Sequence, residues 1–226
     1  MFFKNYKKWE TEFAGRKFTL ETGKMAGLAN AAFLATYGET QVLCTVTASA
    51  KPREGIDFFP LSVDYEEKMY SVGKIPGSFL RREGRASEHA ILTSRCIDRP
   101  IRPLFPKDLR NDCSVVATVM SVDPDCSPEV TAAIGVSAAI AVSDIPWDGP
   151  ISSVNVGLVD GEIVLNPTLE QREKTDLTLT VASTADLVAM IEAGGNEIPD
   201  AVMFDCIMAG HEETKKMVQF IQAGYG

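Results

Sequence analysis

Arginine residues are concentrated in one part of a chain that is otherwise acidic. Between residues 81 and 110, eight basic side chains accompany four acidic ones, so this segment has a net charge of +4, whereas the whole chain of 226 residues has a net charge of −9. A local charge of the opposite sign indicates a binding site for an anionic partner. The six arginines at the centre of this segment are Arg81, Arg82, Arg85, Arg95, Arg99 and Arg102.

The first of these arginines lie in a loop whose composition is typical of contacts with single-stranded nucleic acid. Phe79 precedes Arg81 and Arg82 in a segment bordered by glycines. An aromatic ring stacks on a base for about 1–3 kcal/mol, and guanidinium groups pair with phosphates. The alternative interpretation is that Phe79 fills the core and that the two arginines pair with Glu83 or Glu88.

The later arginines lie in a predicted helix and just beyond it. Arg95 and Arg99 are four residues apart in a helix predicted over 87–99, so their side chains project from one face. Arg102 follows in a predicted extended segment, because the helix is expected to end before a proline. The alternative is that these arginines pair with Asp98. Because the nearby acids are too few to neutralise six arginines, the sequence favours an anion-binding surface.

Residues typical of other chemistries are few. Asp123 and Asp125 stand at the end of a predicted strand, where they either bind a metal ion or only shape a turn. His89 and His211 lie in predicted helices without a serine or cysteine partner that would indicate a triad. The five cysteines are scattered, and no Cys-x-x-Cys or glycine-rich nucleotide loop occurs. These residues therefore indicate no catalytic triad, no zinc site and no nucleotide-cofactor loop, and the role of the two aspartates stays open at this point.

The hydrophobic pattern predicts the fold class. Three helices are expected, and two runs of strands precede them, which predicts an α+β domain with a mixed sheet packed with helices. No linker is visible, so residues 1–226 are expected to form one domain. No signal peptide or membrane-spanning run is found, which favours the reducing cytoplasm. The predicted helices are 87–99, 127–143 and 199–222, and the predicted strands are 12–22, 31–37, 41–47, 58–65, 113–122, 151–158, 162–165, 177–182 and 187–193.

Five long segments of the chain have a distinctive sequence: ETGKMAGLANAAFLATYGETQVLCTV, FFPLSVDYEEK, GSFLRREGRASEHAILTSRCIDRPIRPLFP, EVTAAIGVSAAIAVSDIPW and PDAVMFDCIMAGHEE. They closely resemble the corresponding segments of the bacterial polynucleotide phosphorylase family, in its first RNase PH-like core. The resemblance extends essentially from end to end, and it implies an RNase PH-like (ribosomal protein S5 domain 2-like) fold.

The resemblance also implies an activity for the parent protein. Members of the family are polyribonucleotide nucleotidyltransferases that degrade mRNA from the 3′ end with inorganic phosphate and Mg²⁺, and that can run in reverse. Each subunit carries two RNase PH-like cores followed by RNA-binding domains, and three subunits form a ring. The expected partners are therefore single-stranded RNA, the second core, two further subunits and degradosome-type proteins, with no membrane. The rest of the parent enzyme is expected to be absent from this chain.

Two family features fall on the arginine-rich segment. The family's channel constriction, Phe-Phe-Arg-Arg, corresponds here to Phe79-Leu80-Arg81-Arg82, in which Leu80 replaces the second aromatic residue. Leucine still narrows a pore but stacks less well on a base. The family's pair of arginines that reaches RNA near its 3′ end corresponds to Arg95 and Arg99. The RNA-binding residues expected from the residues and the resemblance together are Phe79, Leu80, Arg81, Arg82, Arg85, Arg95, Arg99 and Arg102.

The residues expected of a phosphorolytic centre are not present. Related active cores hold phosphate on a serine-rich turn at a helix N-terminus, whereas the equivalent turn here contains Pro128, which lacks an N–H donor, and Glu129, which adds negative charge. The acid, acid and lysine of the active core correspond to Glu170, Asp176 and Thr178. We therefore expect a core that guides RNA and builds the ring but binds neither phosphate nor Mg²⁺ itself.

Two other hypotheses remain open from the sequence. The first is a purely structural trimerisation core whose basic residues are mostly salt-bridged and do not contact RNA. The second is an independent enzymatic activity, for example on a nucleotide, which no residue supports positively. Dependence of RNA affinity on salt distinguishes an RNA-binding groove from a structural core.

Overall fold

The computed structural model describes residues 5–77 and 79–225, with the side chain of residue 225 excluded. It contains two β-sheets and four α-helices within this range. The elements are, in chain order, β1 (Lys7–Phe13), β2 (Arg16–Thr22), β3 (Ala31–Tyr37), β4 (Thr40–Pro52), β5 (Leu61–Glu67), η1 (Met69–Val72), α1 (Glu88–Ile101), η2 (Arg102–Leu104), β6 (Asn111–Ser121), α2 (Pro128–Val142), β7 (Ser152–Val159), β8 (Glu162–Leu165), α3 (Leu169–Lys174), β9 (Leu177–Ser183), β10 (Val188–Gly195) and α4 (Asp200–Tyr225).

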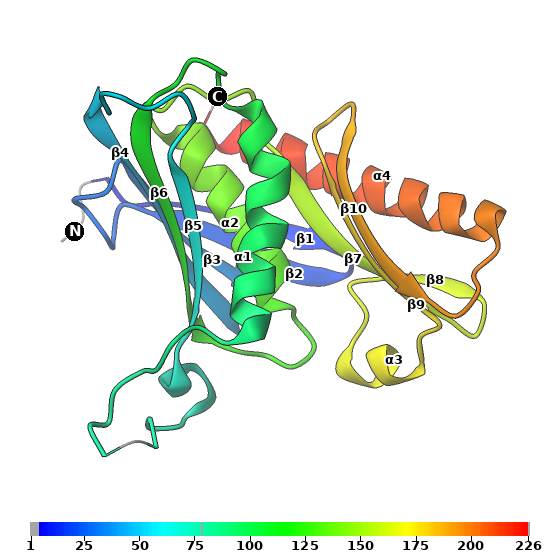
Figure 1. Ribbon diagram of the computed structural model, residues 1–226. Helices are drawn as coiled ribbons and strands as arrows, with labels where there is room; N and C mark the ends of the chain where they lie inside the picture. Colours follow the sequence, from blue (N-terminus) through cyan, green and yellow to red (C-terminus); the bar gives the residue numbers. More distant parts are fainter. Residues whose placement is uncertain (1–4, 78, 226) are drawn as a thin grey trace.

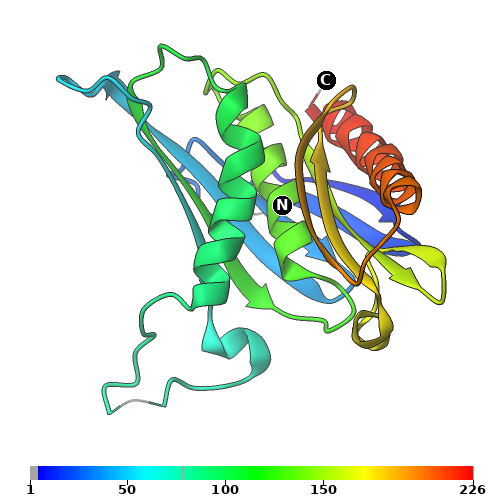
Figure 2. The ribbon, with the colours of Figure 1, turned by 45° about the vertical axis from the view of Figure 1, so that its right-hand side comes forward.

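The larger sheet has six strands in the order β1-β2-β3-β4-β6-β5. Its neighbouring strands are antiparallel except for β5 and β6, which are parallel, so the sheet is mixed as predicted. The smaller sheet has four antiparallel strands in the order β10-β9-β7-β8. Helices α1 and α2 cover one face of the larger sheet, and α4 lies along the smaller one (Figure 1; Figure 2). The α+β fold class is confirmed.

Helix α2 is the centre of the core. After Glu129 it contains no charged residue, and nearly all of its central residues are buried. It contacts β3, β4 and β6 of the larger sheet and β7 of the smaller one. A helix that is apolar on all sides is stable only when it is covered on all sides. Its buried hydroxyl groups are satisfied, since Ser137 accepts the N–H of Ile151 at 2.9 Å and Thr131 donates to the carbonyl of Ser127 at 2.8 Å.

One predicted strand is in fact a hairpin. The prediction placed a single strand over 12–22, but Ala14 and Gly15 both have positive φ angles, 46° and 76°, and form a two-residue turn between β1 and β2. Such turns require the left-handed conformation at both central residues, which alanine seldom signals in a sequence. The buried carboxylate of Glu213 from α4 accepts the N–H of Ala14 at 2.9 Å and so supports this turn.

Helix α1 differs from its prediction at its end and in its buried face. It continues through Pro100 to Ile101, and Arg102 lies in the helical turn η2 rather than in an extended segment. Pro100 removes one backbone donor in the last turn of the helix, but its ring and Ile101 are buried, which favours the helical path. The helical pattern over 87–99 predicts that Ile91 faces the core, but this residue is 51% exposed.

We predict that Gly135→Ala destabilises the protein. A Cβ atom at Gly135 in α2 would lie 2.6 Å from Sγ of Cys44 and 2.9 Å from Cβ of Ala35. Overpacking of this kind costs about 1–3 kcal/mol, which exceeds the roughly 1 kcal/mol that alanine gains over glycine in a helix. Urea denaturation should therefore show a lower free energy of unfolding.

The matched control for this prediction is Gly194→Ala in β10, where a Cβ atom has no neighbour within 4 Å. We expect its free energy of unfolding to change by no more than about 0.5 kcal/mol. Equal stabilities of the two variants would show that α2 does not pack as closely against β3 and β4 as the structure indicates.

Candidate nucleic-acid interface

The segment between β5 and α1 forms a loop that projects from the body of the protein (Figure 1, lower left). Near its start, the backbone N–H of Met69 donates to Oε1 of Glu83 at 2.9 Å, so the two arms of the loop are joined. Phe79 and Leu80 are 99% and 69% exposed. The alternative in which Phe79 fills the core is therefore wrong, and both side chains are available for contacts with another molecule.

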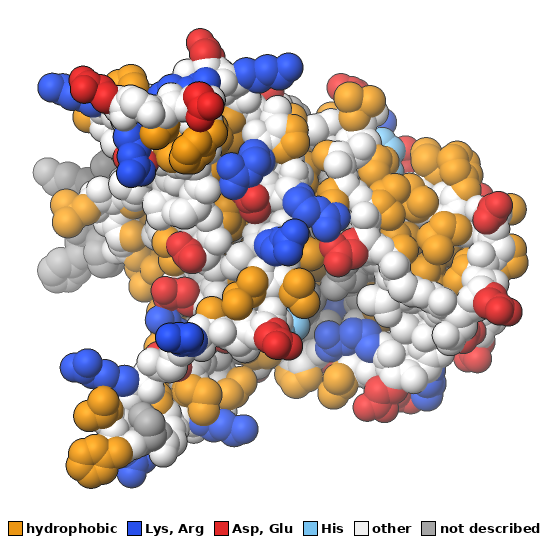
Figure 3. Space-filling model, in the orientation of Figure 1, with side chains coloured by type: hydrophobic (Ala, Val, Ile, Leu, Met, Phe, Trp, Pro, Cys, Tyr) orange, Lys and Arg blue, Asp and Glu red, His pale blue; other side chains and the backbone are white. Residues whose placement is uncertain are grey.

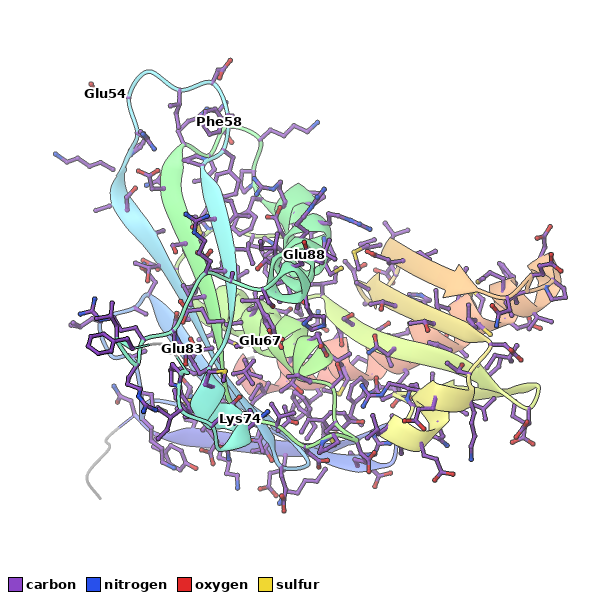
Figure 4. All side chains as sticks on the ribbon, turned by 60° about the horizontal axis from the view of Figure 1, so that its bottom comes forward. Glu54, Phe58, Glu67, Lys74, Glu83 and Glu88 are labelled. Atoms are coloured by element: carbon purple, nitrogen blue, oxygen red, sulfur yellow. The ribbon has the colours of Figure 1, made fainter. Side chains whose placement is uncertain are left out.

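A groove of about 1020 Å³ lies between this loop, β5 and the first half of α1. It collects predicted site residues from two elements, because Leu80, Arg82 and Arg85 line it from the loop and Arg95 lines it from α1. Its walls also carry acids. Figure 4 shows Glu67 at the end of β5 and Glu83 in the loop, and both line the groove. Phe79, Arg81, Arg99 and Arg102 lie outside the groove lining.

The arginines of α1, together with Arg102 of η2, form an exposed basic row (Figure 3, centre). Two arginines of the row are engaged by acids. Arg102 makes two hydrogen bonds to Asp98, at 2.7 and 3.0 Å, and Arg99 pairs with Glu192 of β10 at 3.1 Å. Arg95 has no acidic partner within 4 Å among the residues that the structure describes.

The loop arginines are less engaged than the row on α1. Within residues 5–77 and 79–225, Arg81, Arg82 and Arg85 form no salt bridge with an acid, and all three are exposed. Glu83, a partner considered from the sequence, instead accepts the N–H of Met69. Four of the six predicted arginines therefore have free charge for an anion. The pairing of Arg99 and Arg102 agrees with the alternative in which basic residues are salt-bridged, but only for those two.

Glu192 organises a second contact on α1. Its carboxylate accepts a hydrogen bond from Sγ of Cys96 at 3.3 Å as well as from Arg99. Burial, followed by the hydrogen bond to Glu192, raises the pKa of the Cys96 thiol to about 11. At neutral pH the thiol therefore stays protonated and donates to Glu192, which holds β10 against α1.

The N-terminus of α2, where the resemblance predicts that active cores hold phosphate, is filled by the chain's own side chains. The hydroxyl of Ser127 accepts the N–H of Val130 at 3.2 Å, as predicted for a helix cap, and donates to the carboxylate of Glu129. An anion at this helix end would meet a carboxylate in place of free N–H groups. The geometry at this end therefore does not resemble a phosphate site.

The aspartates just before α2 shape a turn. Asp123 accepts the N–H groups of Asp125 and Glu39, at 3.0 and 3.3 Å, and the hydrogen bond from Asp125 is the main cause that lowers the pKa of Asp123. Asp125 accepts the N–H of Leu169 at the start of α3. The turn interpretation of this pair is thus supported. Among the described residues, no group of three or more His, Cys, Asp or Glu side chains could hold a metal ion.

The positions that correspond to the active-core acids are occupied locally. Glu170 pairs with Lys174 of the same short helix, and Asp176 accepts a hydrogen bond from Asn196 at 3.4 Å. Thr178 lies in β9 at the position expected for the lysine. The sequence prediction did not include α3. Thr168 and Gln171 form a capping box, and their spacing in the sequence is a signal that could have predicted the start of this helix.

Both histidines have partners that sequence reasoning missed. Nδ1 of His211 lies 2.9 Å from Oγ of the buried Ser183, which also contacts Thr214, so this histidine is part of the core between α4 and β9. His89 lies between Glu67 and Glu129, which come from other elements. No signal in the sequence identifies such partners, because they are brought together only by the fold.

Comparison with known proteins shows which family this chain resembles. Residues 14–146 match the first domain of the 3′ exoribonuclease family, and residues 149–213 match its second domain. The polyribonucleotide nucleotidyltransferase of Ruminiclostridium cellulolyticum is 61% identical over 216 residues, and that of Clostridioides difficile is 58% identical over 217 residues. Each match covers 96% of this chain but 31% of the relative, so the chain spans about a third of the length of these relatives.

A solved structure supports the fold independently. The crystal structure of rice (Oryza sativa) Rrp46 matches with a TM-score of 0.75 at 16% identity, over 93% of this chain and 94% of that one. The resemblance to bacterial polynucleotide phosphorylase is confirmed by the relatives, and the RNase PH-like fold by this structure. The chain belongs to the 3′ exoribonuclease family, with both domains of the family present in one continuous polypeptide.

Proposed function

We propose that this chain is the first RNase PH-like core of a polyribonucleotide nucleotidyltransferase, which degrades mRNA in the cytoplasm from its 3′ end with inorganic phosphate. In this proposal the core guides single-stranded RNA and helps to build a ring of three subunits, while phosphorolysis takes place in the second core. The ring and degradosome-type proteins would be its protein partners. Among the described residues, no helix is long and apolar enough to cross a membrane.

The observation that carries the proposal is the free positive charge on one side of an acidic protein. Arg82, Arg85 and Arg95 come from two elements and line the same groove, and none of them pairs with an acid among the described residues. Arg81 stands next to the exposed Phe79 at the outer part of the loop. Guanidinium groups bind phosphates, and an exposed aromatic ring stacks on bases, so this surface suits a single RNA strand.

The residues of this core do not suit the chemistry that the parent enzyme requires. Glu129 fills the helix end where phosphate would bind, and Thr178 stands where the active core has a lysine. The carboxylates of Asp123 and Asp125 are occupied by backbone N–H groups, so they do not fit a Mg²⁺ site. We therefore assign phosphate and Mg²⁺ to the other core and derive no catalytic step in this one.

A purely structural core is the second candidate function. The ion pairs of Arg99 with Glu192 and of Arg102 with Asp98 favour it, because these arginines stabilise the contact of α1 with its surroundings. The two functions differ in what the unpaired arginines do, and this difference can be measured.

We predict that the purified chain binds single-stranded RNA through its unpaired arginines. Arg82→Ala/Arg85→Ala should weaken binding at least tenfold, because each substitution removes a contact between a guanidinium group and a phosphate. The slope of log affinity against log salt should also fall by roughly 1.4, about 0.7 for each contact with a single strand. Fluorescence anisotropy of a labelled oligonucleotide at several salt concentrations measures both quantities.

The matched control is Arg53→Ala, which removes an exposed arginine that pairs with Asp112 and lies outside the groove. It should change RNA affinity less than twofold. If the double variant binds RNA as the wild type does, with the same salt slope, the structural function is correct and RNA guiding is not.

We also predict that the purified chain does not degrade RNA. With single-stranded RNA, inorganic phosphate and Mg²⁺, it should release no nucleoside diphosphates, because the helix end that would hold phosphate is filled by Glu129. Thin-layer chromatography of labelled RNA measures the release, with a full-length polyribonucleotide nucleotidyltransferase as the positive control. Phosphate-dependent release by the chain alone would place a phosphorolytic centre in this core.

A further inference from the structure

Three elements meet where the projecting loop joins the body of the protein. Strand β5 ends at Glu67, helix α1 begins after its cap Ser87, and helix α2 begins after its cap Ser127. An unbroken series of side-chain contacts connects them. Oγ of Ser87 donates to Oε2 of Glu67 at 2.9 Å, Oε1 of Glu67 lies 2.9 Å from Nδ1 of His89, Nε2 of His89 lies 3.2 Å from Oε1 of Glu129, and Oε2 of Glu129 accepts from Ser127.

The two ends of this series have the same chemistry. Each serine hydroxyl accepts a backbone N–H of its own helix, Ser87 from Ala90 at 3.0 Å and Ser127 from Val130 at 3.2 Å. A hydroxyl has a single hydrogen, so each serine then donates that hydrogen to a carboxylate. Both helix caps are therefore oriented by the carboxylates, and among the described residues it is His89 that connects the two carboxylates.

The two carboxylates act on a common region. Tyr65 lies two residues before Glu67 in β5, is 2% exposed, and its hydroxyl has no hydrogen-bond partner among the described residues. Burial, and then the charges of Glu129 and Glu67, raise the pKa of Tyr65. Because the two negative groups repel one another, a group that donates to both is needed to hold them close. His89 lies between them with one ring nitrogen on each carboxylate, and its protonated imidazole donates from both nitrogens.

We propose that Glu67, His89 and Glu129 form a clasp that fixes the base of the projecting loop to the ends of α1 and α2. The loop leaves the body at Glu67 and returns at Ser87, and these residues are in direct contact. The clasp thereby sets where Arg85, two residues before Ser87, lies relative to Arg95 on α1. Its members are positioning residues for the RNA binding proposed above, and the inference rests on that function.

One substitution distinguishes positioning from simple electrostatics, because the two predict opposite changes in RNA affinity. Glu67→Gln removes a negative charge from the wall of the groove, so electrostatics alone would make RNA binding tighter. Loss of positioning makes RNA binding weaker, because the arginines of the loop and of α1 no longer contact the same RNA strand together. Glu66→Gln is the matched control, since Glu66 neighbours Glu67 and lines the same groove but pairs with Lys68 instead.

The clasp has a readout that does not depend on RNA. The N–H groups of Ala90 in α1 and Val130 in α2 donate to Ser87 and Ser127, the serines that the clasp carboxylates hold. The hydrogen-exchange rates of these two amides, measured by NMR, therefore report on both helix caps. His89→Ala should accelerate exchange at both amides at least fivefold. His89→Arg should keep the wild-type rates, because a guanidinium donates to both carboxylates. A role confined to α1 would leave Val130 unchanged.

RNA affinity is then measured for the same folded variants by anisotropy. We expect Glu67→Gln and His89→Ala to weaken binding at least threefold, and Glu66→Gln and His89→Arg to weaken it less than 1.5-fold. Unchanged exchange at Ala90 and Val130 in His89→Ala would overturn the clasp, whatever the RNA result.

Two further outcomes separate this inference from the proposed function. If exchange is faster but RNA affinity is unchanged or higher, while Arg82→Ala/Arg85→Ala weakens binding, the positioning role is wrong and RNA guiding stands. If the arginine variant itself binds normally, RNA guiding fails, and with it the positioning role, while the exchange rates still decide whether the clasp exists.

Discussion

The burial of helix α2 between the two sheets is the constraint on which the rest of the structure depends. The helix is stable only where apolar surface covers it on every side. Strands β3 and β4 cover one side, at a distance that only Gly135 permits, and β7 covers another. Because α2 contacts both sheets, its position determines how the two family domains face one another. It also fixes where the N-terminus of α2 lies relative to the start of α1.

Positive charge is concentrated beyond this core, where the fold does not need it. The arginines of α1 occupy its exposed face, and the loop that carries the others projects from the edge strand β5. Arg99 is paired with Glu192, and Arg102 with Asp98. Among the described residues, the loop arginines and Arg95 have no acidic partner, and their free charge distinguishes this surface from the rest of an acidic molecule.

The helix end that could have bound phosphate serves the fold instead. Ser127 accepts the N–H of Val130 near the start of α2, and Glu129 connects Ser127 through His89 to the base of the loop. The same place in the fold thus carries a structural connection where related cores are expected to carry a ligand. A carboxylate suits this place because, like a phosphate, it is stabilised by the positive end of a helix dipole.

The sequence by itself determined the features that depend on neighbouring residues. Asp160-Gly161 specifies the hairpin of β7 and β8, Ser127-Pro128 specifies the start of α2, and the run of apolar and β-branched residues over 113–122 indicates the strand β6. The excess of arginine over acid between residues 81 and 110 is likewise a property of the chain alone. The resemblance of long segments to a known family was also enough to predict the fold from the sequence alone.

Only the tertiary structure decided which of these charges are free. Glu192 is 93 residues from Arg99 along the chain and meets it because β10 lies beside α1. His89 is 40 residues from Glu129 and contacts it only because the two helices begin side by side. The continuation of α1 through Pro100 depends on the burial of Ile101. Pairing, burial and the groove itself arise from distances across the fold, and local sequence patterns contain no information about them.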